Sequence, residues 1–418
     1  MHVHAHTDFQ PGWIQTYKPV LIALHTLPNV GRKRLFQVMK ALSEIVQESI
    51  EDISSVAHER PVESEFPSLS TLQVHIEMLK QAIVASSNRV GRRYHDTDHL
   101  LQTLTPSYVT TTLYRLVEER IHVLMWGEFA YPEMLVHIPD PPPFLYVKGK
   151  VDLLTTEALA VVGTRRPTPY GLRATRELTQ AMALSGLTIV SGLAEGVDAM
   201  AHRAALSIHG RTVAVLGSSH DHLYPRAHEP LYEEIVQEGA VLTEYPLDTR
   251  PARGLFPERN RLISGLSMGV LVIEGHLNSG SMITAQHALE QGRDVFAVPG
   301  PIFSAQSAGP HRLIQEGAKL VHHPQDILGE MPLKGMQGLS SKASARGHIE
   351  QTPLDQAASA LPHDLGVYLK EAVHFDDLVM KTALSPEVLL SILMPLVVAG
   401  TVEKLPGHRY RLRFNEHL

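Results

Sequence analysis

The sequence predicts an α/β protein with a mainly parallel, doubly wound sheet, a helical domain before it and a winged helix after it. Short, nearly continuous apolar runs alternate with amphipathic stretches over residues 158–321. Strands that are buried on both faces between crossover helices have this texture. Residues 13–105 show helical periodicity without such runs, and a helix–helix–hairpin pattern closes the chain.

Composition limits the class of protein. The chain has 418 residues, and a domain typically spans about 100–200, so we expect several domains. The 44% hydrophobic and 19% charged residues are typical of a globular chain and exclude a wholly disordered one. The lack of cysteine excludes disulfides, thiolate metal sites and cysteine nucleophiles. With a net charge of -7, any nucleic-acid affinity must come from a local basic patch.

The same sequence argues against membrane contact. No run approaches the roughly 20 apolar residues of a membrane span. Residues 1–8 lack the basic flank and apolar core of a signal peptide. Because a chain without cysteine also suits a reducing compartment, we expect a cytoplasmic protein.

The N-terminal helical stretch is interrupted by Leu-Pro-Asn-Val-Gly at residues 27–31. A proline followed by a glycine between two periodic segments predicts a tight helix–helix turn. Arg32, Lys33 and Arg34 follow directly. Two interpretations remain open: a small bundle with a solvated basic turn, or a helix-hairpin-helix whose backbone amides contact phosphates.

Apolar runs predict the strands of the core. A short strand at residues 144–147 follows a proline-rich connector at residues 139–143. The other runs are residues 158–162, 187–190, 212–216, 240–242, 269–273 and 295–298. Helical stretches between them indicate βαβ units, so the loops after these strands should share the carboxyl edge of the sheet, where ligands bind.

Residues 331–360 are poor in large apolar residues and contain glycines and serines typical of a linker. A short helix starts at residues 376–378. Ser-Pro-Glu at residues 385–387 then supplies the cap, proline and acid that open a longer helix to about Val398. A hairpin at residues 401–413 completes a winged-helix layout.

The presumed recognition helix of this winged helix, residues 386–398, has no basic residue. Winged helices that read a duplex usually present positive charge to it. We therefore favour a protein–protein or regulatory role for this domain. Arg409, Arg411 and Arg413 in the wing keep duplex binding as the alternative.

The first strand of the parallel core ends in Gly163, Thr164, Arg165 and Arg166, and a helix follows. Glycine permits close approach of a ligand, and the helix start favours an anion. Two adjacent arginines favour a phosphate-bearing partner over a structural ion pair. The loop matches neither the dinucleotide fingerprint nor the lysine-bearing phosphate loop, so we expect no dinucleotide and no nucleotide hydrolysis.

Two other loops open helices with small polar residues that suit anions. These residues are Ser191, Gly192, Ser281 and Thr284. Asp198 is interpreted as a buried residue that holds the loop after residue 191. His202 lies one helical turn later. Since neither a nucleophile nor a metal set accompanies this pair, we interpret it as structural rather than as a general base.

The densest basic segment is residues 250–265. It carries Arg253, Phe256, Arg259, Asn260 and Arg261. Arginines supply bidentate phosphate contacts, and Phe256 offers a face on which a base can stack. This combination suits single strands, whose bases are free to stack. The alternative is a surface loop with a core phenylalanine.

These motifs, in this order, resemble the DNA-processing protein A family, also called DprA or Smf. The matching strings are Val-Val-Gly-Thr-Arg at 161–165, Ser-Gly-Leu-Ala-Glu-Gly-Val-Asp at 191–198, Phe-Pro-Glu-Arg-Asn-Arg-Leu-Ile-Ser-Gly at 256–265, Ser-Gly-Ser-Met-Ile-Thr-Ala at 279–285 and Val-Pro-Gly at 298–300. The resemblance is strong over residues 126–321. The N-terminal helices look like the family's sterile-alpha-motif-like domain, and the C-terminal part looks like its winged helix.

The resemblance implies four parts: a helical domain at 1–110, an extended Rossmann-like core at 111–330, the linker at 331–360 and the winged helix at 361–418. It implies a homodimer that binds single-stranded DNA and mediates homologous recombination. Family members protect incoming strands during natural transformation and load RecA on them, displacing single-strand-binding protein. They are not regarded as enzymes, and we expect no cofactor and no metal. The expected DNA-binding residues are Gly163, Thr164, Arg165, Arg166, Ser191, Gly192, Arg253, Phe256, Arg259, Asn260, Arg261, Ser281 and Thr284.

Two other functions are alternatives to this one. A Rossmann-like nucleotide-processing enzyme of the phosphoribohydrolase kind would carry a Pro-Gly-Gly-x-Gly-Thr signature, which the sequence lacks. The sequence also offers no pair of carboxylates with acid–base spacing. The second alternative is a scaffold whose winged helix recruits a transcription or recombination protein. Deleting residues 361–418 would abolish recruitment by such a scaffold.

Overall fold

A computed structural model describes residues 11–53, 68–89 and 96–331, and most of 365–412. The expected linker and Arg413 lie outside the described residues, apart from residue 331. The chain divides into two compact units: unit 1 comprises Met1–Thr155 and Val213–Leu266, and unit 2 comprises Thr156–Thr212 and Ser267–Leu418. Across the described ranges, no helix combines the length and apolarity that a membrane span requires.

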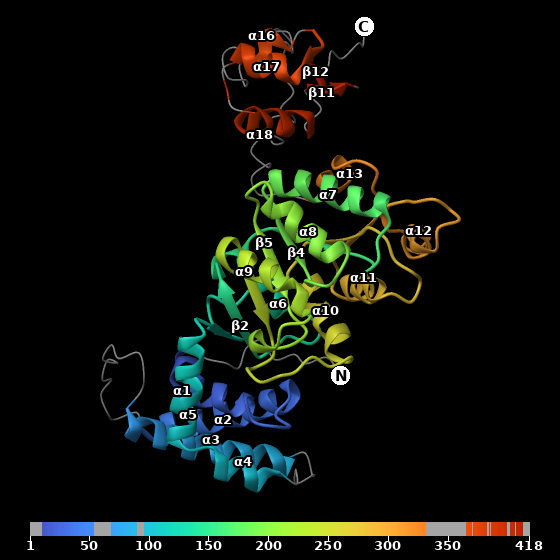
Figure 1. Ribbon diagram of the computed structural model, residues 1–418. Helices are drawn as coiled ribbons and strands as arrows, with labels where there is room; N and C mark the ends of the chain where they lie inside the picture. The colour runs from blue at the N-terminus through green and yellow to red at the C-terminus, as the bar shows by residue number, and fades with distance from the viewer. Residues whose placement is uncertain are drawn as a thin grey trace, which may run out of the picture. The chain divides into compact units, whose positions relative to one another are not determined.

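Unit 1 begins with a group of helices (Figure 1). They are α1 (Pro11–His25), α2 (Arg32–Ile53), α3 (Leu69–Arg89), α4 (Thr97–Thr103) and α5 (Pro106–Glu118). The predicted turn is confirmed, because α1 and α2 are joined by a tight turn in which Asn29 adopts a left-handed φ of 63°. Leu21, Leu35 and Leu79 are fully buried in the core of this unit.

The strands of unit 1 are β1 (His122–Met125), β2 (Phe144–Gly149), β5 (Thr212–Val215, from Val213 on) and β6 (Ala240–Thr243). Their order is β1-β2-β6-β5. The first two pairings are antiparallel, and β5 pairs parallel to β6. Phe144 and Tyr146 of β2 join the helical core, so the helices and these strands share one apolar interior. Strand β1 was not predicted, although residues 121–126 form an apolar run with one histidine.

Short elements connect the strands of unit 1. They are α6 (Glu133–Val136), η1 (Val151–Thr155), η2 (His220–His222), η3 (Arg226–His228), α9 (Glu229–Glu238) and α10 (Leu255–Gly265). Because β5 and β6 run parallel, the loops that follow them leave the same edge of the sheet. These two loops position most of the candidate residues of unit 1.

Unit 2 is a parallel α/β layer structure, as predicted. Its strands are β3 (Ala158–Val162), β4 (Thr188–Ser191), β7 (Gly269–Val272), β8 (Asp294–Ala297) and β9 (Lys319–Leu320), in the order β4-β3-β7-β8-β9. Every pairing among them is parallel. The loops after β3, β4, β7 and β8 therefore share one edge, as the sequence led us to expect.

Helices cover the sheet of unit 2. They are α7 (Pro169–Leu184), α8 (Val197–Leu206), α11 (Gly280–Glu290), α12 (Ala308–Gln315) and α13 (Gln325–Leu328), with a short turn η4 (Ala305–Ser307). Helices α7 and α8 lie along one another (Figure 1) and pack on one face through Met182 and Ala201, against Leu159 and Val161. Alternate residues of each strand face the opposite side, where α11 contacts β7 and β8.

The C-terminal region is a winged helix, as predicted. It contains α16 (Leu365–Tyr368), β10 (Val373–His374), α17 (Phe375–Thr382), α18 (Pro386–Val398), β11 (Val402–Leu405) and β12 (Arg409–Leu412). Its antiparallel sheet has the order β10-β12-β11. Leu378, Leu389 and Tyr410 are buried in its small core. In the wing, Arg411 forms an ion pair of 3.1 Å with Glu403, so one of the wing arginines has an internal partner.

Candidate nucleic-acid interface

A buried carboxylate holds the loop after β3 in place. Glu274, which follows β7, is 2% exposed. Its Oε2 accepts a hydrogen bond of 2.8 Å from the Thr168 amide, and its Oε1 accepts one of 2.6 Å from the Thr168 hydroxyl. The Thr164 amide donates to the Glu274 carbonyl at 2.7 Å. Both ends of the loop are thus fixed to one residue.

This carboxylate corrects one expectation. The sequence indicated that the start of α7 would attract an external anion, but Glu274 supplies the anion itself. A Cβ atom on Gly171, in the first turn of α7, would overlap the Glu274 carboxylate, so only glycine fits there. Thr168 caps the helix by accepting from the Gly171 amide at 3.1 Å. Arg165 and Arg166 of the same loop are exposed.

The loop after β4 is closed by internal hydrogen bonds. The Ser191 hydroxyl is fully buried and donates to the Val161 carbonyl at 2.7 Å. The Gly192 amide donates to Asp198 Oδ2 at 3.2 Å, which matches the interpretation of Asp198 as the residue that holds this loop. His202 is buried, with its Nδ1 2.7 Å from the Thr212 hydroxyl.

The loop after β7 is similarly compact. Ser281 and Thr284 are buried at the start of α11. The Ser281 hydroxyl lies 2.8 Å from that of Ser279, and the Thr284 hydroxyl donates to the Gly280 carbonyl at 3.3 Å. In unit 2, Ser191, Ser281 and Thr284 thus shape the edge of the sheet, whereas Arg165 and Arg166 present charge to solvent.

The basic segment of unit 1 differs most from expectation. The sequence predicted no helix within residues 250–265, but Leu255–Gly265 is the helix α10. Pro257 lies in its first turn, where a missing amide hydrogen costs no helical hydrogen bond. Arg253 precedes the helix and is exposed, and Phe256 is partly buried.

Three predicted contact residues lie in the interior along α10. Arg259, Asn260 and Arg261 are 4%, 9% and 5% exposed. The Arg259 guanidinium donates to the Val215 carbonyl at the end of β5. In the structure, α10 turns these two arginines toward the ends of β5 and β6, where Arg259 bonds the Val215 carbonyl and Arg261 bonds Glu244. Their contact with single-stranded DNA stays a prediction.

Arg261 forms a buried ion pair with Glu244, which follows β6. Its two terminal nitrogens donate to the two carboxylate oxygens at 2.6 and 2.7 Å. Glu244 is 5% exposed. Burial alone would lower the pKa of Arg261, but the hydrogen bonds and charge of Glu244 outweigh it and raise that pKa. The geometry is that of a bidentate, charge-assisted pair.

A second set of ion pairs joins the helical hairpin to this region. Arg32, at the start of α2, contacts Asp140 at 2.6 Å and Glu258 of α10 at 2.9 Å. Arg34 is 6% exposed and forms an ion pair of 2.9 Å with Asp96. The basic turn is therefore not simply solvated, since two of its three cations have carboxylate partners.

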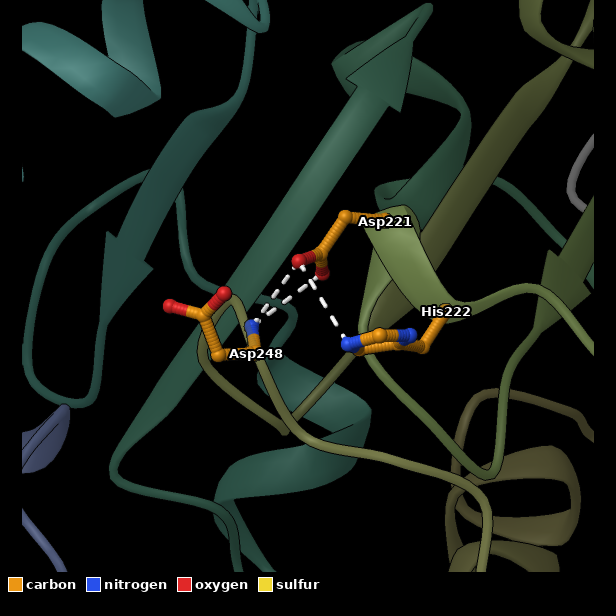
Figure 2. A group of neighbouring side chains, drawn as sticks. All are labelled: Asp221, His222 and Asp248. Carbon is orange, nitrogen blue, oxygen red and sulfur yellow. Dashed lines mark hydrogen bonds and ion pairs between the residues drawn. The ribbon is translucent and has the colours of Figure 1, made fainter.

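The loops after β5 and β6 are bound to each other. The Ser219 amide and hydroxyl both donate to the Thr249 carbonyl, at 3.1 and 2.9 Å. The Asp248 amide donates to both carboxylate oxygens of Asp221, at 3.2 and 3.0 Å, as Figure 2 shows. These contacts make one framework of the two loops.

A group of three side chains resembles a metal site (Figure 2): Asp221, His222 and Asp248. Each offers one atom that could ligate a metal ion, and these atoms lie within 4.8 Å of one another. Arg115 of α5, however, donates to both oxygens of Asp248 at 2.6 and 3.1 Å, and this hydrogen bond lowers the pKa of Asp248. A cation here would compete with the guanidinium. We interpret the group as an ion-pair network that ties the helices to the two loops.

Sequence reasoning missed Glu274, Glu244 and Asp248 as positioning residues. Each follows a strand and binds a group far away in the sequence. The sequence did offer one signal: each of these acidic residues follows shortly after an apolar run that predicts a strand, β7 for Glu274 and β6 for the other two.

These features define a Rossmann-like α/β core with positively charged loops and an appended winged helix. The model of the DNA recombination-mediator protein A family matches residues 122–332, and that of the DprA winged helix domain matches residues 350–408. Protein Smf of Escherichia coli is 40% identical over 308 residues, which is 73% of this chain and 81% of that protein. The DNA processing protein DprA of Bacillus subtilis is 43% identical over 221 residues, 53% of this chain and 74% of that protein.

Among solved structures, the X-ray structure of DNA processing protein A from Streptococcus pneumoniae matches with a TM-score of 0.54 and 31% identity. The match covers 78% of this chain and 99% of that one. The chain belongs to the DprA/Smf family of DNA recombination-mediator proteins.

Proposed function

We propose that this protein binds single-stranded DNA through the motif-bearing loops of its core and mediates homologous recombination. The observation that carries the proposal is the exposure of Arg165, Arg166 and Arg253 at loops whose backbones are fixed by buried groups. Exposed arginines on a rigid frame bind phosphates without a large ordering cost. The family membership supports a role in recombination.

The finer parts of the proposal follow the family resemblance. We propose that the protein acts as a homodimer in the cytoplasm and loads RecA on single strands covered by single-strand-binding protein, as in natural transformation. We also propose that it acts by binding rather than as an enzyme. Two of the carboxylates described above have positioning contacts: Glu274 accepts from the Thr168 amide and hydroxyl, and Glu244 pairs with Arg261.

The test is fluorescence anisotropy with a labelled oligonucleotide, single-stranded and duplex, across a salt series. We expect salt-sensitive binding that favours the single strand. A second arm follows RecA filament assembly on an oligonucleotide coated with single-strand-binding protein. Equal binding to both oligonucleotides contradicts the single-strand preference, and unchanged RecA assembly contradicts the loading role.

Replacing Arg165 with alanine should weaken single-strand binding and lower the slope of log K against log salt by about 1, because one phosphate contact is lost. The matched control is Arg176→Ala, which removes an exposed arginine from α7 in the same unit. Its affinity and slope should equal those of the parent protein. If Arg165→Ala also keeps the parental affinity and salt slope, Arg165 does not contact DNA.

A further inference from the structure

We propose that Tyr224 and Phe256 form a base-stacking platform for single-stranded nucleic acid in unit 1. This inference rests on the proposed DNA binding and adds to it a residue from the loop after β5, which the sequence motifs did not assign. The two rings have centroids 5.6 Å apart and planes inclined by 52°. Tyr224 is 51% exposed, so it offers more open aromatic surface than the partly buried Phe256.

Phe256 is seated on a backbone position that has no side chain. A Cβ atom on Gly217 would lie 2.7 Å from Cδ1 and 3.1 Å from Cε1 of the Phe256 ring. The ring therefore lies directly on the backbone at the end of β5, where only glycine leaves room for it. The Phe256 ring thus packs against Gly217 and also contacts the Tyr224 ring, so it holds the tyrosine in place.

The platform stands on the framework of the two loops. Tyr224 lies two residues after His222, and Phe256 lies in the first turn of α10, after the segment that contains Asp248 and Thr249. The hydrogen bonds from Ser219 to Thr249 and from Asp248 to Asp221 hold these segments together. A pre-organised aromatic surface loses little conformational freedom when a base stacks on it.

Exposed arginines flank both rings in the sequence. Arg226 follows Tyr224 by two residues, and Arg253 precedes Phe256 by three. Arg250 is exposed on the same loop. Aromatic faces interleaved with arginines are what single-stranded nucleic acids require, since the arginines track phosphates while the bases stack. Tyr224 contacts the Phe256 ring and is otherwise half exposed, and a stacking role accounts for an aromatic side chain held at the surface.

The experiment compares Tyr224→Leu, Tyr224→Phe and the parent protein in the anisotropy assay with a single-stranded oligonucleotide. Loss of one stacked base should weaken binding at least about 5-fold in Tyr224→Leu, whereas Tyr224→Phe should retain parental affinity. The salt slope should stay unchanged in both, because no cation is removed. Tyr114→Leu, at another exposed tyrosine of unit 1, is the matched control and should bind like the parent.

The outcomes separate this inference from the proposed function. If the parent protein does not bind the single strand, the proposed function fails and the platform with it. If the parent binds and Tyr224→Leu binds equally well, the platform alone is refuted. A loss of affinity in Tyr224→Phe would also refute stacking, because it would assign the effect to the hydroxyl. Unchanged tryptophan fluorescence of each variant verifies that unit 1 is folded.

Discussion

Replacing Arg261 with leucine should destabilise unit 1 by about 3–5 kcal/mol, because the change leaves the Glu244 carboxylate buried without its partner. Glu244 is 5% exposed, and Arg261 holds both of its carboxylate oxygens. The double variant Arg261→Leu, Glu244→Leu removes both charges and should recover most of the loss, since a buried ion pair and a well-packed apolar pair of similar volume have similar stabilities. The free energy of unfolding by guanidinium, followed by tryptophan fluorescence, measures this.

Fluorescence suits this question because both tryptophans of the chain, Trp13 and Trp126, belong to unit 1. The same variants distinguish a positioning role for Arg261 from a DNA contact. If the arginine positions α10, the double variant binds a single strand with the parental salt slope. A variant Arg261→Leu that keeps its stability but loses about one unit of salt slope would instead return Arg261 to the DNA interface.

The sequence was most informative where the physical cause is local. Apolar runs marked β3 and β7 because buried parallel strands expose no polar face, and Ser385 with Pro386 marked the start of α18. The helix–helix turn around Gly31 was equally visible, since proline and glycine act on the backbone at their own positions.

Features that depend on partners distant in the sequence were not visible. The sequence predicted a basic surface at the arginines of α10, because Pro257 and the charges conceal the helical pattern of this segment. Only the tertiary structure shows that Arg261 forms an ion pair with Glu244, 17 residues away. Likewise, no residue near Gly171 in the sequence predicts that Glu274, over a hundred residues later, binds the start of α7. Contacts with distant groups thus bury several of the predicted residues: Arg261 pairs with the Glu244 carboxylate, whereas Arg259 and Ser191 bond backbone carbonyls.

Acidification should destabilise unit 1 through two buried histidines. Burial lowers the pKa of His25 to about 4 and that of His220 to about 4. His220 Nε2 lies 3.0 Å from the Tyr146 carbonyl, and its Nδ1 lies 2.9 Å from the Tyr232 hydroxyl. Since a carbonyl only accepts, Nε2 carries the proton and Nδ1 accepts from the tyrosine, so the ring is neutral in the fold. His25 Nδ1 lies 2.9 Å from the Tyr146 hydroxyl.

The sign of the effect follows from the direction of these shifts. An unfolded histidine titrates near 6.5, so below that pH the unfolded chain binds protons that the folded chain refuses. Stability is therefore full above about pH 7 and is lost as the pH falls toward 4, by about 2 kcal/mol per histidine at pH 5. In His220→Gln, the loss of unfolding free energy between pH 7.5 and pH 5 should be smaller by about that amount. The exposed His122→Gln should leave the loss unchanged. Equal pH dependence in the parent and in His220→Gln would mean that this buried ring accepts a proton without opening the fold.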